Sequence, residues 1–162
     1  MMKLDRKRAE LELERAGKLN PGKWTEHSRY IAQACENIAA RCNGMSPDAA
    51  YCYGLMHDIG RYAGVTSERH LIDGYRFCME HFVKNAVYDD YDRLVQLCDS
   101  LALPSGFCLL EKRFVDVALR YGTPPVMAER WRRILEIRDM FEKKINGSIY
   151  DLLPGVEENT FR

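Results

Sequence analysis

The sequence lacks a surplus of charge of either sign. Lys plus Arg and Asp plus Glu each number 24 in 162 residues, so the formal net charge at pH 7 is zero. This balance gives no global basic field for nucleic acid, although it leaves room for a local patch. No apolar run approaches the roughly 20 residues that cross a membrane. Residues 1–17 alternate Lys, Arg and Glu with Leu, so we expect no signal peptide and a cytoplasmic location. From the balanced charge and the missing apolar run we also expect no membrane partner and no nucleic-acid partner.

Closely spaced cysteine pairs are also missing. The chain has six cysteines, but no two of them form a Cys-x-x-Cys pair. Cys35 and Cys42 lie two helical turns apart beside Ile31 and Ile38, on an apolar helical face. A disulfide framework is the alternative, but this placement favours buried, reduced thiols in a cytosolic protein.

Internal repeats, low-complexity tracts and strand-like alternation are absent as well, and a 3.6-residue apolar period dominates. With 162 residues, 46% of them hydrophobic, the chain can form one domain with a sizeable core. We predict an all-α, single-domain helical bundle of six or seven helices. Residues 1–22 are expected to form a charged N-terminal helix and turn, 23–153 the main domain, and 154–162 an irregular tail.

Helix boundaries are marked by capping residues, glycine and proline. The first helix should be exposed and should stop near Gly17, and Thr25 and Ser46 are the expected N-caps of the next two. The expected helices, with their caps, cover residues 3–16, 25–42, 46–58, 66–85, 89–103, 108–121 and 125–146, followed by a short turn at 148–153.

A histidine and an aspartate, His57 and Asp58, close the apolar run that begins at Tyr51. Two such polar side chains are costly to bury without a partner. Neighbours on a helix also point about 100° apart, so one small ligand could hardly contact both. A metal ion could, provided that other helices supply further ligands.

Two more polar side chains fall on apolar helical faces. His27 lies one turn before Ile31, and Asp99 lies one turn after Val95. Four unrelated, hydrogen-bonded polar groups are the simpler alternative. Taken together, however, two imidazoles and two carboxylates on three helices suit a borderline or hard divalent ion. Such a set leaves coordination positions for water and substrate.

These residues carry a resemblance to a known family. His27, then the His-Asp-Ile-Gly string at 57–60, then Asp99, in that order on an all-α scaffold, resemble the HD superfamily of metal-dependent phosphohydrolases. The sequence is most similar to small single-domain members with this string, over roughly residues 24–106. The strings Trp24–Ser28 and Leu94–Ser100 resemble the opening and closing helices of the family.

The resemblance implies an HD-type catalytic domain over 23–153, with His27, His57, Asp58 and Asp99 as metal ligands. The implied reaction is hydrolysis of a phosphate ester or anhydride by a metal-activated water, with Asp58 also able to accept a proton. Arg61 stands where many relatives have a lysine near the substrate phosphate, although an exposed loop arginine is an equal alternative. His70, followed four residues later by Gly74, resembles a family histidine that binds a second metal or contacts phosphate.

The chain departs from the larger, dinuclear relatives, which carry another histidine before the final aspartate. The sole candidate is His81, which lies eleven positions after His70. On a continuous helix that separation is about 16 Å, too long for one compact centre. We therefore expect His81 to be structural or exposed. One divalent ion (Mn, Fe, Co, Ni, Mg or Zn) is predicted, without a second metal.

The leading hypothesis is hydrolysis of a nucleotide or a related small phosphate ester or anhydride. A non-catalytic module that binds metal and nucleotide is the alternative, and iron-dependent oxygenase chemistry is a remote one. The apolar stripe around Trp131 is expected to pack in the core, with a homodimer contact as the other possibility.

Overall fold

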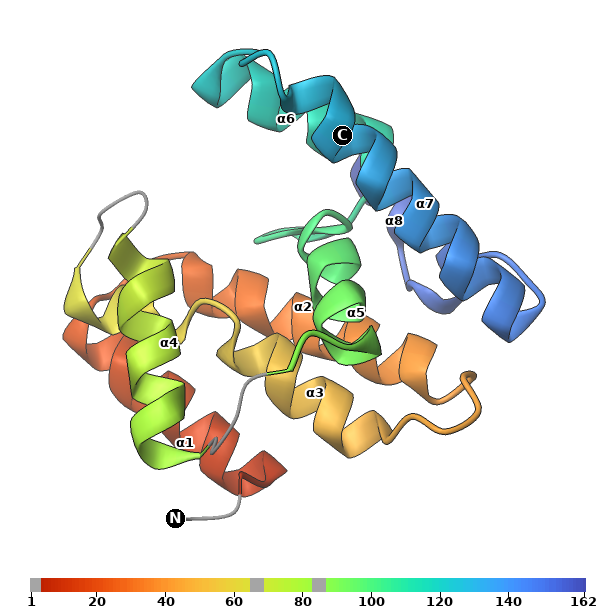
Figure 1. Ribbon diagram of the computed structural model, residues 1–162. Helices are drawn as coiled ribbons and strands as arrows, with labels where there is room; N and C mark the ends of the chain where they lie inside the picture. The colour runs from red at the N-terminus through yellow and green to blue at the C-terminus, as the bar shows by residue number, and fades with distance from the viewer. Residues whose placement is uncertain (1–3, 65–68, 83–86) are drawn as a thin grey trace.

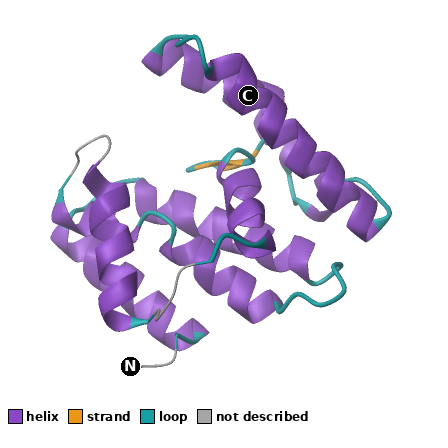
Figure 2. Ribbon diagram, viewed as in Figure 1, coloured by secondary structure: helices purple, strands orange, loops and turns teal. Residues whose placement is uncertain are grey.

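The computed structural model describes residues 4–64, 69–82 and 87–162. In these residues the fold is all-α apart from one short β-hairpin, as predicted (Figures 1 and 2). The described residues form eight α-helices and two 3-10 helices, more than the six or seven helices expected, because the segment after Asp58 and the C-terminal tail are also helical. The elements are, in order, α1 (Arg6–Leu19), α2 (Trp24–Ala39), α3 (Pro47–Met56), the 3-10 helix η1 (Ile59–Ala63), α4 (Arg69–His81), α5 (Asp90–Asp99), β1 (Ala102–Leu103), β2 (Gly106–Phe107), α6 (Leu110–Tyr121), α7 (Met127–Ile145), the 3-10 helix η2 (Ile149–Leu152) and α8 (Val156–Thr160).

Side-chain caps fix the starts of α3 and α5, among others. Ser46 caps α3 by accepting a hydrogen bond from the backbone N–H of Ala49, as expected. Asp89 and Asp92 form a capping box at the start of α5. The prediction that Thr25 caps α2 is wrong. The helix already includes this residue, and the Thr25 hydroxyl donates to the carbonyl of Gly22.

Other boundaries also differ from the expected ones. Helix α1 continues through Gly17 to Leu19, and a Cβ atom at Gly17 would lie 2.9 Å from Cγ2 of Thr25. This glycine therefore serves a close contact with α2 rather than a helix end. The tail is not irregular, because α8 forms within it. The expected helix start at 66–68 and the end near 85 lie outside the described residues.

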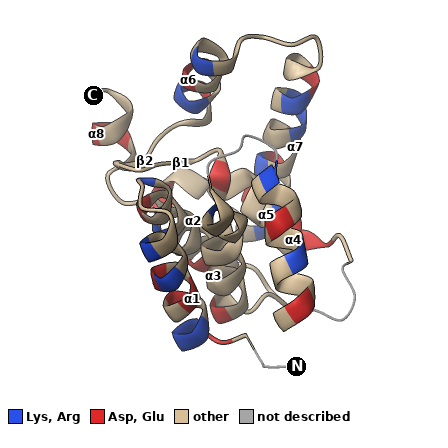
Figure 3. Cartoon of the chain, turned by 90° about the vertical axis from the view of Figure 1, so that its left-hand side faces the viewer, with Lys and Arg blue, Asp and Glu red and all other residues tan. Residues whose placement is uncertain are grey.

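Two hydrophobic clusters share α2. One joins α2 to α5, the hairpin, α6, α7 and the C-terminal segment, while the other joins α2 to α1, α3 and η1. Helix α1 was expected to be exposed, but Ala9, Leu13 and Ala16 are fully or almost fully buried in the second cluster. These three residues recur at helical spacing, so a helix rich in charge still buries one apolar stripe. Figure 3 shows charges of both signs along the exterior of the helices.

A close crossing of α2 and α3 sets the geometry of the candidate site. A Cβ atom at Gly54 would lie 2.9 Å from Cα of Ala32 and 3.0 Å from Sγ of Cys35. The glycine lets the two backbones approach until no side chain fits between them. As a result, the N-terminal half of α2 and the C-terminal end of α3 lie side by side, as Figure 1 shows.

The hairpin and the C-terminal helices complete the structure. Strands β1 and β2 are antiparallel and pair Ala102 with Phe107 and Leu103 with Gly106. Trp131 of α7 stacks on Phe114 of α6 with ring centroids 5.3 Å apart, and its apolar stripe packs against the core, as expected. All six cysteines are free thiols, and none of the described helices is long and apolar enough to cross a membrane.

Candidate metal centre

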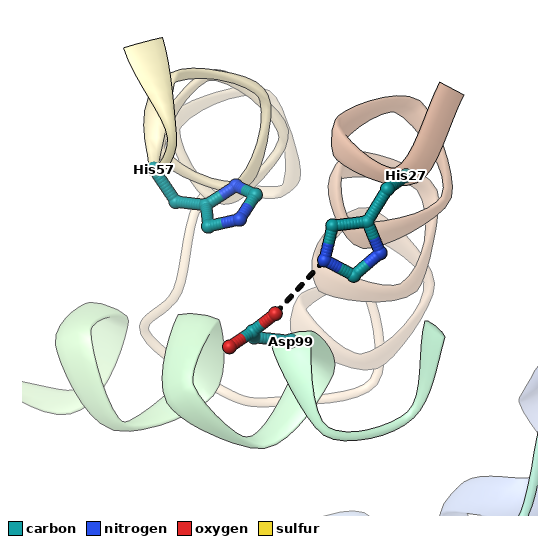
Figure 4. Close-up of side chains that lie close together, drawn as sticks. All are labelled: His27, His57 and Asp99. Atoms are coloured by element: carbon teal, nitrogen blue, oxygen red, sulfur yellow. Dashed lines mark hydrogen bonds and ion pairs between the residues drawn. The ribbon is translucent and has the colours of Figure 1, made fainter. Parts of the chain in front are cut away.

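Three helices bring His27, His57 and Asp99 together. One ligand atom from each residue lies within 4.8 Å of the corresponding atoms of the other two. Figure 4 shows the side chains converging from α2, from the end of α3 and from α5. The structure thus brings together three of the four residues predicted as metal ligands, while their ligation of a metal stays a prediction.

His57 is oriented by its own helix. It is the C-cap residue of α3, and its Nδ1 lies 2.8 Å from the carbonyl oxygen of Gly54. With Nδ1–H donating to that carbonyl, the lone pair of Nε2 is free to bind a cation. The ring meets the ring of His27 edge-on, with centroids 5.6 Å apart.

His27 and Asp99 are already paired. Nε2 of His27 lies 2.9 Å from Oδ1 of Asp99, and the side chain of His27 is 10% exposed while that of Asp99 is 48% exposed. Burial acts to raise the pKa of Asp99. The hydrogen bond from His27 and the charges of His57 and Arg113 outweigh it, so the pKa of this carboxyl lies below its ordinary value. The carboxylate is therefore ionised and ready to bind a cation at neutral pH.

Asp58, the fourth expected ligand, lies beside the cluster and is not a member of the three-residue group. Its Oδ2 accepts a hydrogen bond from Nε of Arg61 at 2.5 Å and lies 3.6 Å from Nε2 of His57. Its Oδ1 lies 3.3 Å from Nε2 of His70. The chain leaves the α-helix at His57 and turns into η1, which directs this carboxylate toward Arg61 and His70. Metal ligation by Asp58 stays a prediction.

The backbone contact between η1 and α4 holds His70 in place. A Cβ atom at Gly60 would lie 1.9 Å from the carbonyl oxygen of His70 and 2.3 Å from the amide nitrogen of Gly74. No other residue type fits between these two backbones without moving them. Gly74 therefore serves the close approach of the η1 backbone at Gly60.

Two hydrogen bonds that the sequence did not predict support the site from the C-terminal end of α1. The indole Nε1–H of Trp24 donates to the carbonyl of Asn20 at 2.8 Å. The side-chain amide of Asn20 donates to the carbonyl of Arg61 at 2.7 Å. The start of α2, which carries His27, is thereby tied to η1, which carries Arg61.

His81 lies at the exposed end of α4, where its ring packs on Phe77 with centroids 4.7 Å apart. This matches the expectation of an exposed or structural residue. The charge of Arg113 of α6, a residue that we did not predict as part of the site, acts to lower the pKa of Asp99. The signal in the sequence was its position three residues after Leu110, on the apolar stripe of its helix.

The donor set fits a divalent metal ion. Two imidazole nitrogens and one carboxylate oxygen suit several first-row divalent ions, and a three-ligand site leaves positions for water and substrate. The cluster is consistent with a single metal, as predicted.

Comparison with protein families gives a match to part of the chain. The family model of the HDOD domain, which is related to the HD superfamily, matches residues 9–73. This segment is less than half of the chain. It contains His27, His57, Asp58, Arg61 and His70, and it ends before Asp99. Comparisons with curated proteins and with solved structures give no match.

Proposed function

We propose that this chain is a metal-dependent phosphohydrolase that cleaves a nucleotide or a related small phosphate ester or anhydride. The orientation of His57 carries the proposal. Its Nδ1 is anchored on its own helix, so Nε2 faces His27 and Asp99 as a cation ligand. A histidine with a purely structural role would not require its Nε2 to be directed at a second imidazole and an ionised carboxylate.

When bound, a divalent ion supplies positive charge to phosphate oxygens and a coordinated water with a pKa lowered toward neutrality. The residues around the cluster supply the remaining functions. Asp58, held by Arg61, lies close enough to Nε2 of His57 to accept a proton from a water at the cluster. Arg61 uses only Nε for this hydrogen bond, so its terminal nitrogens can bind phosphate oxygens.

The test is a screen of phosphate esters with Mn, Co, Ni, Mg and Fe. We expect turnover with at least one ion, and we expect His57→Ala and Asp58→Ala to reduce it by about 100-fold or more. His81→Ala is the matched control, because this histidine is exposed at the end of α4 and is not one of the cluster residues. Full turnover by Asp58→Ala, or by enzyme stripped with a chelator, would overturn the proposal.

A second candidate is a non-catalytic module that binds metal and nucleotide. One observation favours it: Asp58 is engaged by Arg61 and lies outside the three-residue group. The same screen separates the two. If no ester is hydrolysed with any ion while a nucleotide raises the unfolding temperature of the metal-loaded protein, the binding module is correct.

A further inference from the structure

Asn20 lies at a junction between three segments of the fold. It is the C-cap residue of α1, and its backbone N–H donates to the carbonyl of Ala16. Its own backbone carbonyl accepts the indole Nε1–H of Trp24, the first residue of α2, at 2.8 Å. Its side chain reaches a segment 41 positions further along the sequence, where Nδ2 donates to the carbonyl of Arg61 at 2.7 Å. Since a carbonyl oxygen only accepts, the NH₂ group of the amide is the one that faces Arg61.

The hydrogen bond from Asn20 falls on a short element that carries site residues. Element η1 is a 3-10 helix of five residues, and hydrogen bonds in such helices have poorer geometry than in α-helices. The carbonyl of Arg61 also accepts from the backbone N–H of Gly64 at 3.1 Å. In the same turn, the backbone N–H of Arg61 donates to the carbonyl of Asp58 at 2.9 Å, and its Nε donates to Oδ2 of Asp58 at 2.5 Å. The residue that Asn20 holds is therefore the residue that holds Asp58.

Core packing fixes only the start of η1. Ile59 and Gly60 are buried, and the built Cβ of Gly60 would lie 1.9 Å from the carbonyl oxygen of His70. Arg61, the next residue, is only half-buried. Packing contacts of this kind set the distance between two backbones, whereas a hydrogen bond also sets their direction. The bond from Asn20 thus orients the part of η1 that packing leaves less constrained.

We infer that Asn20 is a positioning residue of the site. It holds the backbone of Arg61, so that the guanidinium keeps Asp58 in place and presents its terminal nitrogens to a substrate phosphate. The inference rests on the proposed function of Arg61 and Asp58. Hydrogen bonds from a guanidinium to phosphate oxygens depend on orientation, so a small shift of η1 weakens them. Because Asn20 acts through Arg61, its contribution to turnover must vanish when the guanidinium is removed.

Asn37 of α2 offers a matched control. Its Nδ2 donates to the carbonyl of Leu152 at 2.8 Å, and Leu152 belongs to the other 3-10 helix, η2. Both asparagines are half-buried, and each ties a 3-10 helix to a distant segment through one hydrogen bond from amide to carbonyl. Element η2 contains neither the cluster residues nor Asp58 or Arg61. Loss of Asn37 should therefore reproduce the effect on stability without the effect on turnover.

The experiment is a double-mutant cycle on kcat/KM for p-nitrophenyl phosphate, with the metal-loaded full chain. Asn20→Ala should lower kcat/KM about 3- to 10-fold, the size of one neutral hydrogen bond, with metal content unchanged. In an Arg61→Ala background the same substitution should change kcat/KM less than about twofold. Asn20→Gln, which keeps the amide donor, should recover part of the loss. Asn37→Ala should keep the kcat/KM of the wild type while lowering the unfolding temperature about as much as Asn20→Ala.

A merely structural role predicts another result. A loss caused by partial unfolding would be equally large in the Arg61→Ala background and would also appear in Asn37→Ala. Either outcome, or an unchanged kcat/KM in Asn20→Ala, would overturn the inference. If Asn20→Ala does not fold, Asn20→Ser takes its place, because the serine side chain is too short to reach the carbonyl of Arg61.

Failure of the proposed function is recognised separately. If the wild type hydrolyses no ester with any ion, binding of inorganic phosphate to the Mn-loaded protein replaces turnover as the readout. Phosphate should then raise the unfolding temperature of the wild type and of Asn37→Ala more than that of Asn20→Ala, and equally little in Arg61→Ala with and without Asn20→Ala. No rise in the wild type, or an equal rise in the wild type and Asn20→Ala, would refute the role of Asn20.

Discussion

Substitution of Gly60 by alanine should separate η1 from α4 and displace His70. The added Cβ would lie 1.9 Å from the carbonyl oxygen of His70, and real Cβ contacts essentially never fall below 3.0 Å. Both obstacles are backbone atoms, so η1 and α4 must move apart by about 1 Å or more. Overpacking of this kind costs about 3 kcal/mol, which for a chain of this length lowers the unfolding temperature by roughly 6–12 °C.

Thermal unfolding followed by circular dichroism measures this change. Gly147→Ala is the matched control, because no atom lies within 4 Å of its added Cβ and its φ angle is not positive. That variant should unfold within about 2 °C of wild type, since substitutions at open positions seldom exceed ~0.5 kcal/mol. Phosphatase activity of Gly60→Ala should fall while its metal content is retained, because His70 contacts Asp58 and is not one of the three cluster residues. An unfolding temperature equal to that of Gly147→Ala would refute this account of the η1–α4 contact.

Two further predictions concern buried titratable groups. The native protein should react with a thiol reagent faster at Cys78 than at the other five cysteines, because those five are buried and Cys78 is half-buried. Burial raises the pKa of Cys78 as well as those of Cys52 and Cys108, so the contrast comes from exposure; equally fast reaction of several thiols would contradict the described core. Burial and the hydrogen bond to Glu10 raise the pKa of Tyr51 from 10.0 to about 12. The stability from this raised pKa is complete below pH 10 and is lost as the pH rises through 12, so Tyr51→Phe should flatten the stability curve over that interval. The free energy of unfolding is measured by urea titration at several pH values between 10 and 12. If it falls equally with pH in the wild type and in Tyr51→Phe, the Tyr51 hydroxyl does not stabilise the fold.

Much of the cluster could be predicted because its residues follow local periodicity. His27 shares a helical face with Ile31, and helical spacing also placed Asp99 on a partly buried face. A 3.6-residue period cannot reveal where a helix changes into a 3-10 turn. That change after His57 turns Asp58 toward Arg61 and His70, which spacing alone could not show.

Contacts between segments that are distant in the sequence account for other features of the structure that could not be predicted. The hairpin that returns α6 to the end of α5 is made of two-residue strands, too short for any alternation to appear in the sequence. The buried stripe of α1, in contrast, was present as Ala9, Leu13 and Ala16, and the many charges of that helix obscured it.

The central claim is that His27, His57 and Asp99 hold one divalent ion. Elemental analysis of the purified protein, with the metal content expressed per chain, tests it most directly. We predict close to one divalent ion per chain in the wild type and in His81→Ala, and little or none in His57→Ala and Asp99→Ala, with all four proteins folded by circular dichroism. A wild-type protein that takes up no divalent ion, or a metal content unchanged by the loss of His57, would contradict the claim.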